Sequence, residues 1–269
     1  MNGIVINIDP VAFSLGHIHI TRYGLIVMLA IMAAVGIAIW EGKRKGIQSE
    51  TILALAPWAV VGGLIGARLF HVIDRWDLYA GNPLQIFAIQ QGGLAIWGGI
   101  AGGALAVVIF ARFKQIPIGK LADTLVPALL VAQIIGRFAC IIDGDAAGGL
   151  TSLPWAFTYL NPGAMTPPGL WGLPTHPYPV YDQLWNLMGL GIALKLRHHF
   201  KTDGFLFLTY VSIYAVGRFV FTYVRQEKVW FWGLQEAQVL AIAILAAVAV
   251  AMIYLYWKSR VRNVPEVST

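Results

Sequence analysis

The sequence has 269 residues, of which 58% are hydrophobic and only 12% are charged. Charged residues make up about a quarter of an ordinary soluble domain, so this composition excludes that class and indicates an integral membrane protein. The formal net charge is +6, but Lys and Arg occur in short clusters between apolar runs, so we expect no nucleic-acid partner. The one cysteine, Cys140, excludes an internal disulfide and a cysteine-based metal cluster, and we expect neither a metal nor a cofactor.

The first 20 residues lack the basic region and the small-residue cleavage site of a signal peptide, so we expect a retained external segment. Apolar segments of the length that crosses a bilayer, roughly 20 residues, follow it. There are seven: residues 21–40, 51–73, 94–111, 121–142, 178–196, 204–224 and 234–257. The sequence therefore predicts an all-α integral membrane protein with seven transmembrane helices, which forms a single membrane domain over residues 1–269.

Basic residues distinguish the two sides of the membrane. The connections after the first, third and fifth segments and the C-terminal tail hold 12 of the 19 Lys and Arg residues: Lys43, Arg44, Lys45, Arg112, Lys114, Lys120, Lys195, Arg197, Lys201, Lys258, Arg260 and Arg262. The opposite side has only Arg75, Arg225 and Lys228. By the positive-inside rule, the N-terminus is outside and the C-terminus is cytoplasmic. The connection over residues 143–177 has no Lys or Arg and is rich in Gly, Pro and aromatic residues, so we expect an ordered external cap there.

Four further arginines lie within or at the edge of the apolar segments, in the outer half of the membrane in this orientation: Arg22, Arg68, Arg137 and Arg218. An arginine at a helix centre costs roughly 2.5–3.5 kcal/mol, so it indicates a functional site with an anionic partner. Arg218 and Arg225 share one face of the sixth helix. We therefore predict an anion-binding pocket. In the alternative interpretation, each arginine reaches the membrane interface or pairs with one of four carboxylates: Asp74, Asp77, Asp143 or Asp145.

The stretch Gly136–Gly149 reads GRFACIIDGDAAGG and brings charge and a thiol to the end of an apolar run. Helical spacing places Arg137 and Cys140 on one face, with Asp143 and Asp145 just beyond the last strongly apolar residue. We expect Cys140 to be a small buried thiol with weak hydrogen-bonding capacity rather than a covalent nucleophile.

Two histidines and several glycines allow two interpretations each. His71 lies one turn after Arg68, and His176 precedes Pro177, so each is a candidate base or a structural residue at the end of a helix. The glycines of GGLIGARLFHVIDRW and GGLAIWGGIAGG suit close helix packing. They would also let backbone N–H groups approach a phosphate, although no Walker or dinucleotide fingerprint is present.

Five stretches together resemble the prolipoprotein diacylglyceryl transferases of bacterial inner membranes: RYGLIVMLA, GARLFHVIDRWDLYAGNPLQIFAIQQGGLAIWGGIAGG, GRFACIIDGDAAGG, HPYPVYDQLW and GRFVFTYVRQ. They occur in the family's order and extend over nearly the whole chain. The resemblance implies seven spans with the N-terminus outside and an active site toward the outer side of the membrane. It also implies transfer of a diacylglyceryl group from phosphatidylglycerol to the lipobox cysteine of a preprolipoprotein signal peptide, with release of glycerol 1-phosphate.

The resemblance also implies residue roles. Tyr23, Arg137, Gly148 and Arg218 stand where the family keeps its functional tyrosine, phosphate-binding arginine, glycine and second arginine. Three positions depart from the pattern. Trp97 replaces a common histidine, although tryptophan also occurs there in some members, so a histidine base is not available at that position. Ala139-Cys140 replaces Gly-Asn, and Asp143 and Asp145 replace Asn and Glu.

We therefore expect these catalytic residues: Tyr23, Arg137, Arg218, Asp143 and Asp145. The expected substrate-binding residues are Arg137, Arg218, Arg68, His71, Trp97, Cys140, Gly148, Arg225 and His176. The general base stays open among Asp143, Asp145, His71 and His176. Two alternative functions are a divergent paralogue that binds or transfers another group derived from an anionic phospholipid, and a transporter. A transporter would place acidic and polar residues across the membrane thickness, whereas the middles of these spans have no Asp or Glu.

Overall fold

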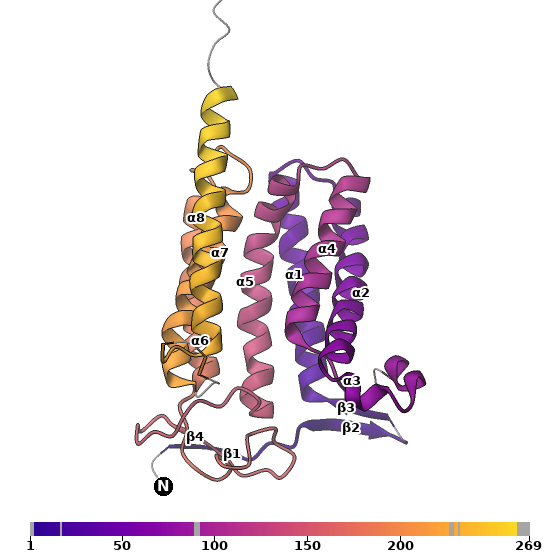
Figure 1. The fold of residues 1–269 in the computed structure, drawn as a ribbon, viewed down its shortest axis with the longest axis vertical. Helices are drawn as coiled ribbons and strands as arrows, with labels where there is room; N and C mark the ends of the chain where they lie inside the picture. Colours follow the sequence, from indigo (N-terminus) through magenta and orange to yellow (C-terminus); the bar gives the residue numbers. More distant parts are fainter. Residues whose placement is uncertain (1–2, 17, 89–91, 226–228, 231, 263–269) are drawn as a thin grey trace, which may run out of the picture. The chain divides into compact units, whose positions relative to one another are not determined.

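The computed structural model of the chain describes residues 3–16, 18–88, 92–225, 229–230 and 232–262, and Lys228 lies outside this part (Figure 1). The described residues are mostly helical. They divide into two compact units: unit 1, which comprises Met1–Ile37 and Leu125–Thr269, and unit 2, which comprises Ala38–Thr124. Two helices cross the boundaries between the units along the chain: α1 (Arg22–Arg44) and α5 (Ile118–Asp143).

Six helices in the described part are long and apolar enough to cross a membrane. They are α1, α2 (Ser49–Asp74), α4 (Ile96–Phe113), α5, α7 (Phe205–Phe221) with the 3-10 turn η3 (Thr222–Val224), and α8 (Glu236–Arg262). The remaining expected segment, residues 178–196, is also helical and forms α6 (Tyr178–Leu196). This helix contains two buried polar residues, Asp182 and Asn186. The prediction of a mainly helical membrane protein is confirmed, and the helix ends lie within a few residues of the expected ones.

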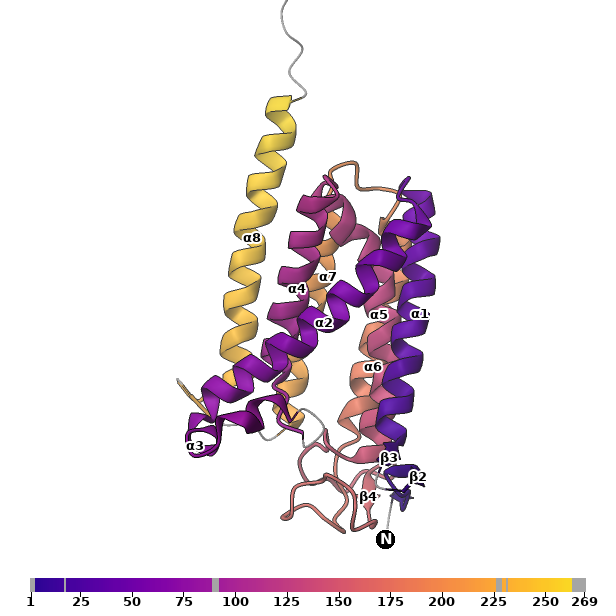
Figure 2. The same ribbon diagram turned by 90° about the vertical axis from the view of Figure 1, so that its right-hand side faces the viewer.

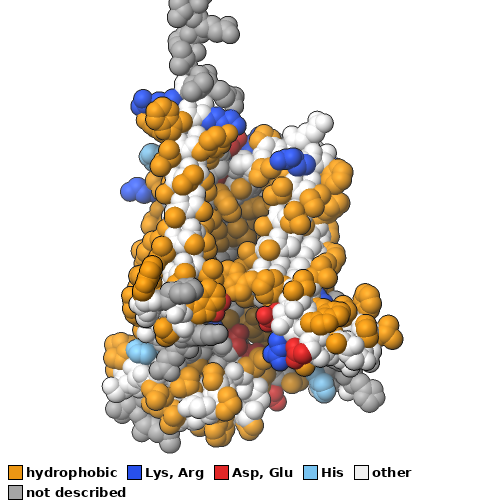
Figure 3. Space-filling view, viewed as in Figure 1, with side chains coloured by type: hydrophobic (Ala, Val, Ile, Leu, Met, Phe, Trp, Pro, Cys, Tyr) orange, Lys and Arg blue, Asp and Glu red, His pale blue; other side chains and the backbone are white. Residues whose placement is uncertain are grey.

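Unit 1 is built on α5 to α8. Helix α7 lies beside both α6 and α8 in Figure 1. The core of this unit contains buried aliphatic residues from three helices: Val126 and Leu130 of α5, Ala193 of α6 and Leu206 of α7. Gly217 lets α7 approach α6, because a Cβ at this position would overlap the indole of Trp185. Hydrophobic side chains lie along the visible face of α8 in Figure 3. Exposed Lys258 and Arg260 belong to the C-terminal end of this helix.

Four short strands of unit 1 are a feature that the sequence analysis did not predict. β1 (Ile4–Ile6) pairs in parallel with β4 (Phe157–Tyr159), so the beginning of the chain lies beside the connection between α5 and α6. β2 (Val11–Leu15) and β3 (Ile18–Thr21) form an antiparallel pair that leads into α1. Arg22, which begins α1, donates from Nε to the backbone oxygen of Asp9 at 2.9 Å and so joins the helix to the preceding segment.

Unit 2 consists mainly of α2 and α4, which lie side by side in both views (Figures 1 and 2). Between them are α3 (Trp76–Tyr79) and the 3-10 helix η1 (Pro83–Phe87). A Cβ on any of four facing glycines would overlap atoms of the opposite helix: Gly62, Gly66, Gly98 and Gly102. The interpretation of these glycines as packing residues is therefore confirmed.

Candidate active site

Arg137 lies in the last two turns of α5 and is held by α6. Its Nε donates to Oδ2 of Asp182 at 2.6 Å, and 23% of the arginine side chain and 8% of the aspartate side chain are exposed. Asn186, one turn further along α6, donates to the same carboxylate oxygen at 3.1 Å. The anionic partner of Arg137 is therefore Asp182, which was not among the four carboxylates that the sequence analysis considered.

Three arginines from α5, α7 and the end of η3 converge on the phenol of Tyr178. Arg218 donates from Nη1 to Tyr178 Oη at 2.8 Å. The guanidinium carbons of Arg137 and Arg225 lie 5.6 Å and 5.2 Å from the centroid of the Tyr178 ring, within cation–π range. Tyr178 is fully buried. Within unit 1 the structure thus brings Arg137, Arg218 and Arg225 together, whereas Arg22, which was also expected near the anion pocket, donates to the backbone oxygen of Asp9.

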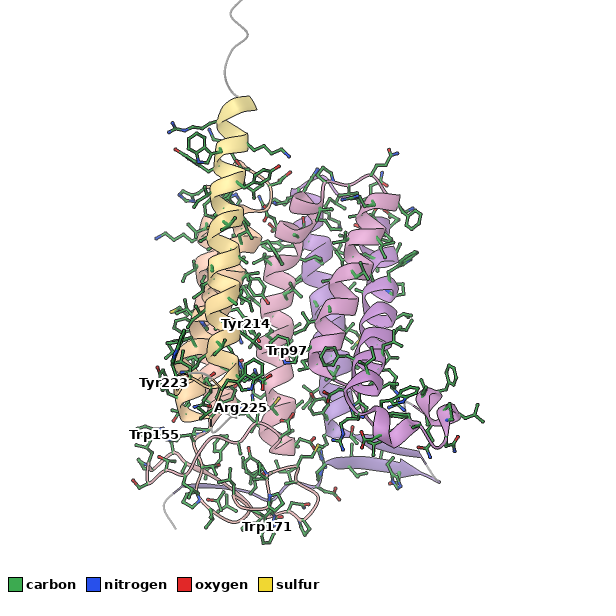
Figure 4. All side chains as sticks on the ribbon, viewed as in Figure 1. Trp97, Trp155, Trp171, Tyr214, Tyr223 and Arg225 are labelled. Carbon is green, nitrogen blue, oxygen red and sulfur yellow. The ribbon has the colours of Figure 1, made fainter. Side chains whose placement is uncertain are left out.

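Figure 4 labels Arg225 and, higher in the view, Tyr214. Tyr214 lies on α7 one turn before Arg218, and Arg225 directly follows η3. Arg218 and Arg225 therefore belong to one continuous stretch of chain, whereas Arg137 comes from α5. We call the three arginines with Tyr178 the arginine cluster.

Cys140 lies beside Arg137, as the helical register predicts. The thiol sulfur accepts a hydrogen bond from Arg137 Nη1 at 3.6 Å, and the residue is buried. Asp143 ends α5 and is buried, whereas Asp145 is exposed. The hydroxyl of Tyr23, in the first turn of α1, lies within electrostatic range of Arg137, Cys140 and both carboxylates. The five expected catalytic residues therefore all belong to unit 1.

Gly148 joins three segments of the site through backbone contacts. Its N–H donates to the carbonyl of His176 at 3.0 Å, and the N–H of Gly149 donates to the carbonyl of Val224 at 2.7 Å. A Cβ on Gly148 would lie 2.7 Å from the Cβ of His176 and 2.9 Å from the carbonyl oxygen of Val224. Only glycine allows this close approach, which fixes the chain directly before Arg225.

His176 belongs to an aromatic cluster at the beginning of α6. Its Nδ1 lies 3.3 Å from Tyr181 Oη, which also accepts a hydrogen bond from the Trp155 indole at 3.1 Å. Burial lowers the pKa of His176 below its ordinary value, so the ring is neutral at pH 7 and can accept a proton.

Tyr159 is a second buried phenol near the carboxylates of this site. Burial, followed by the charges of Asp145 and Cys140, raises the pKa of Tyr159. Its Oη has no hydrogen-bond partner among the described residues. The phenol therefore stays protonated and is a potential donor close to the expected catalytic carboxylates.

The other expected substrate-binding residues, Arg68, His71 and Trp97, lie in unit 2. Arg68 is buried, lies over the ring of Tyr79 at 5.1 Å and donates to the backbone carbonyls of Gln85, Ile86, Gly92 and Gly93 at 2.6–3.0 Å. These contacts hold the connection between α3 and α4. The ring of His71 packs edge-to-face on the same tyrosine, with centroids 6.0 Å apart. Trp97 lies in the first turn of α4 and is 40% exposed. Substrate binding by these three residues stays a prediction.

Comparison with known proteins identifies the family. The family model described as prolipoprotein diacylglyceryl transferase matches residues 10–254. The chain belongs to this family. A phosphatidylglycerol–prolipoprotein diacylglyceryl transferase of Clostridioides difficile is 36% identical over 96% of this chain and 99% of its own length. Transferases of the same name from Dehalococcoides mccartyi and Nostoc sp. are 36% and 34% identical over 95% and 93% of the chain, and 96% and 90% of their own lengths.

The family match and the named relatives confirm the resemblance to the prolipoprotein diacylglyceryl transferases that the five sequence stretches indicated. The structure adds two site residues that sequence reasoning missed, Tyr178 and Asp182. Both lie in HPYPVYDQLW, one of the five stretches, but the sequence analysis treated this stretch as the start of a helix. The available signal was an acidic residue one turn inside an apolar segment, which indicates a charge partner in the membrane.

Proposed function

We propose that this protein transfers the diacylglyceryl group of phosphatidylglycerol to the lipobox cysteine of a preprolipoprotein. The names of its relatives state the two substrates. The observation that carries the proposal is the arginine cluster, in which Arg137, Arg218 and Arg225 surround one buried phenol. A guanidinium presents a planar fork of donors that matches two phosphate oxygens and does not lose its charge, so this cluster suits the phosphodiester of the lipid.

The proposed reaction is a nucleophilic substitution at C3 of the lipid glycerol. The substrate cysteine loses its proton to a base, and the thiolate forms a C–S bond with C3 while the C3–O bond breaks. Glycerol 1-phosphate leaves with the electron pair. The arginines hold the phosphodiester in line with the thiolate and stabilise the negative charge that grows on the departing phosphate. Within unit 1, the residues that can take the thiol proton are Asp143, Asp145 and His176.

Tyr23 is proposed to donate a hydrogen bond to the lipid headgroup. Its position in the first turn of α1, within electrostatic range of Arg137 and Cys140, supports this role. Gly148 contributes through the close approach of its backbone to His176 and Val224 rather than through a free N–H. Cys140 is assigned to the wall of the phosphate site, because its buried sulfur touches Arg137.

The membrane arrangement is also part of the proposal. We place α6 as a seventh crossing, with the N-terminus outside, the C-terminus cytoplasmic and residues 143–177 as an external cap over one membrane domain. The 19-residue length of α6 and the burial of its polar residues support a crossing that is shielded by other helices. The absence of Lys and Arg from residues 143–177 supports the outer side for this segment and for the active site, at a bacterial inner membrane.

The direct test is incubation of the purified protein with phosphatidylglycerol and a lipobox peptide, followed by measurement of the peptide mass. We expect the mass of one diacylglyceryl group to be added with phosphatidylglycerol and not with phosphatidylcholine. No added mass with any anionic phospholipid would overturn the proposed function. Modification from a different anionic phospholipid, but not from phosphatidylglycerol, would instead establish the divergent paralogue.

Two variants test the phosphate assignment in the same assay. We expect Arg137→Ala and Arg218→Ala each to lower turnover by at least ~100-fold, which is the loss typical of removing one donor to a developing anion. Lysine at either position should restore only part of the rate, because it supplies a point charge rather than a fork. Near-normal turnover in either folded alanine variant would contradict the assignment.

A further inference from the structure

Tyr178 occupies the centre of the arginine cluster without any assigned role in the reaction. It is fully buried and packs with Cys140, Ala146, Phe221 and Val224, so it joins the ends of α5, α6 and α7. Ordinary packing would need only a large apolar ring at this position. The phenol oxygen instead accepts a hydrogen bond from the Arg218 guanidinium at 2.8 Å. The residue therefore has a polar function in addition to its place in the core.

Tyr178 also offsets the repulsion among the three positively charged arginines around it. Guanidinium groups repel one another, and this repulsion is strong where water is scarce. An aromatic ring offers its negative face to a cation within about 6 Å, and a phenol oxygen offers a lone pair. Arg137 and Arg225 use the ring, at 5.6 Å and 5.2 Å, while Arg218 uses the oxygen.

Tyr178 contacts all three arginines, and each contact restricts one guanidinium group. Arg137 is fixed by the Asp182 carboxylate as well as by the ring. Arg218 contacts the phenol oxygen from α7, and Arg225 lies over the ring from the position after η3. A long arginine side chain loses rotamer freedom when it binds an anion, so a contact that orients it beforehand strengthens that binding.

We propose that Tyr178 is a positioning residue of the transferase, which orients Arg218 and Arg225 toward the phosphodiester of phosphatidylglycerol. This inference rests on the proposed function. The hydroxyl determines the plane of the Arg218 fork, and the ring determines the place of the Arg225 charge. A guanidinium carries five N–H donors, so a hydrogen bond to the phenol and contacts with two phosphate oxygens are compatible in one arginine.

Tyr178→Phe separates the two contributions, because it removes the hydroxyl and keeps the ring. We expect kcat/KM for phosphatidylglycerol to fall about 10-fold, the loss typical of a hydrogen bond to a charged group. The KM for the lipobox peptide should stay within about twofold of the wild-type value, because Arg218 is proposed to bind the lipid phosphate and not the peptide. Tyr178→Leu removes hydroxyl and ring, so its kcat/KM for the lipid should be lower again.

Tyr210→Phe is the matched control. Tyr210 lies on the same helix as Arg218, and its part-buried hydroxyl accepts a hydrogen bond from Gln133 at 2.8 Å. We expect this variant to keep the wild-type kinetic constants for both substrates. Equal losses in Tyr178→Phe and Tyr210→Phe would show that any buried phenol is needed for the fold, and would overturn the positioning role.

A second measurement covers the case in which Tyr178→Phe does not fold. A tetrafluorinated tyrosine at position 178 nearly keeps the shape of the ring but is a much stronger acid than tyrosine. At neutral pH it is a phenolate that competes with the lipid phosphate for the arginines, so we expect a lower kcat/KM for phosphatidylglycerol. Native mass spectrometry should show less retained phosphatidylglycerol, relative to phosphatidylcholine, than in the wild type. Unchanged lipid kinetics in the fluorinated protein would overturn the inference while wild-type transfer still supports the proposed function. Absence of wild-type transfer would instead reject the function on which the inference rests.

Discussion

Substitution of Asp182 by asparagine tests whether the ion pair with Arg137 organises the site. Asp182→Asn preserves the shape of the side chain and removes its charge. The wild-type carboxylate accepts from Arg137 Nε at 2.6 Å and from Asn186 Nδ2 at 3.1 Å, and the aspartate side chain is only 8% exposed. The variant therefore leaves the arginine in a largely buried position without its anionic partner.

The expected loss of stability follows from this burial. Removing one partner of a buried ion pair typically costs about 3–5 kcal/mol, because the other charge stays buried and unpaired. The Arg137 side chain is 23% exposed and retains some contact with solvent, so we expect the lower end, about 3 kcal/mol. A loss of this size corresponds to a melting temperature lower by roughly 5–10 °C for a chain of this length.

The same substitution should lower kcat without raising the KM for phosphatidylglycerol. Without the carboxylate, no negative charge in α6 competes with the lipid phosphate for Arg137, so the KM for phosphatidylglycerol should stay the same or fall. The guanidinium also loses the contact that orients it, so we expect kcat to fall at least ~10-fold through poorer alignment with the departing phosphate. Peptide transfer at varied lipid concentration measures both constants.

Asn186→Ala is the control for this experiment. It removes the second hydrogen bond to Asp182 and leaves the ion pair in place, so we expect a loss of about 1 kcal/mol and a kcat close to that of the wild type. If Asp182→Asn melts at the wild-type temperature and retains the wild-type kcat, the ion pair with Asp182 does not orient Arg137 and does not organise the site.

Substitutions at three further positions test other contacts of the site. Gly148→Ala should lower stability by about 1–3 kcal/mol, because its Cβ meets His176 at 2.7 Å, whereas Gly169→Ala, with open space around it, should be neutral in the same thermal melt. Cys140→Ser should retain peptide transfer, and Cys140→Asn should preserve or raise the rate because an amide can donate to the anion beside Arg137; loss of transfer in both variants would show that the thiol is required. Burial lowers the pKa of His176 in the folded state, so below a pH of about 6.5 the folded protein binds fewer protons than the unfolded protein and loses stability as the pH falls. His176→Gln removes this group, so its melting temperature should drop less than that of the wild type between pH 7.5 and pH 5. An equal drop in the two proteins would contradict the lowered pKa.

Helices were predictable from the sequence because their signal is local. An apolar run such as residues 51–73 must satisfy its own backbone in a membrane, so α2 over Ser49–Asp74 follows from hydropathy alone. The strands have no such signal. β1 has three residues, and its partner β4 begins at Phe157, far along the chain. Such a short pairing depends on which distant segment folds beside it, and composition does not show that.

The charged residues of the site were predictable for a similar reason. Arg137 and Arg218 stood out because an arginine in an apolar segment is costly. Tyr178 did not stand out, because tyrosine is common at membrane interfaces and its position gives no sign of a charge beside it. The structural role of Arg68 was not predictable from the sequence. The four backbone carbonyls that it contacts lie 17 to 25 residues away in the sequence, and only the fold brings them near.

The pairing of β1 with β4 has a consequence for the order of events during biosynthesis. Ile4 leaves the ribosome long before Phe157, its partner in the parallel pair. Helices α1, α2, α4 and α5 lie between the two strands along the chain, so they must be inserted first. Until then, the backbone groups of β1 need another partner, which water at the membrane surface can supply. The first strand of this protein therefore reaches its final place only after α5 has been made, and a nascent chain halted before Phe157 would lack this strand pair.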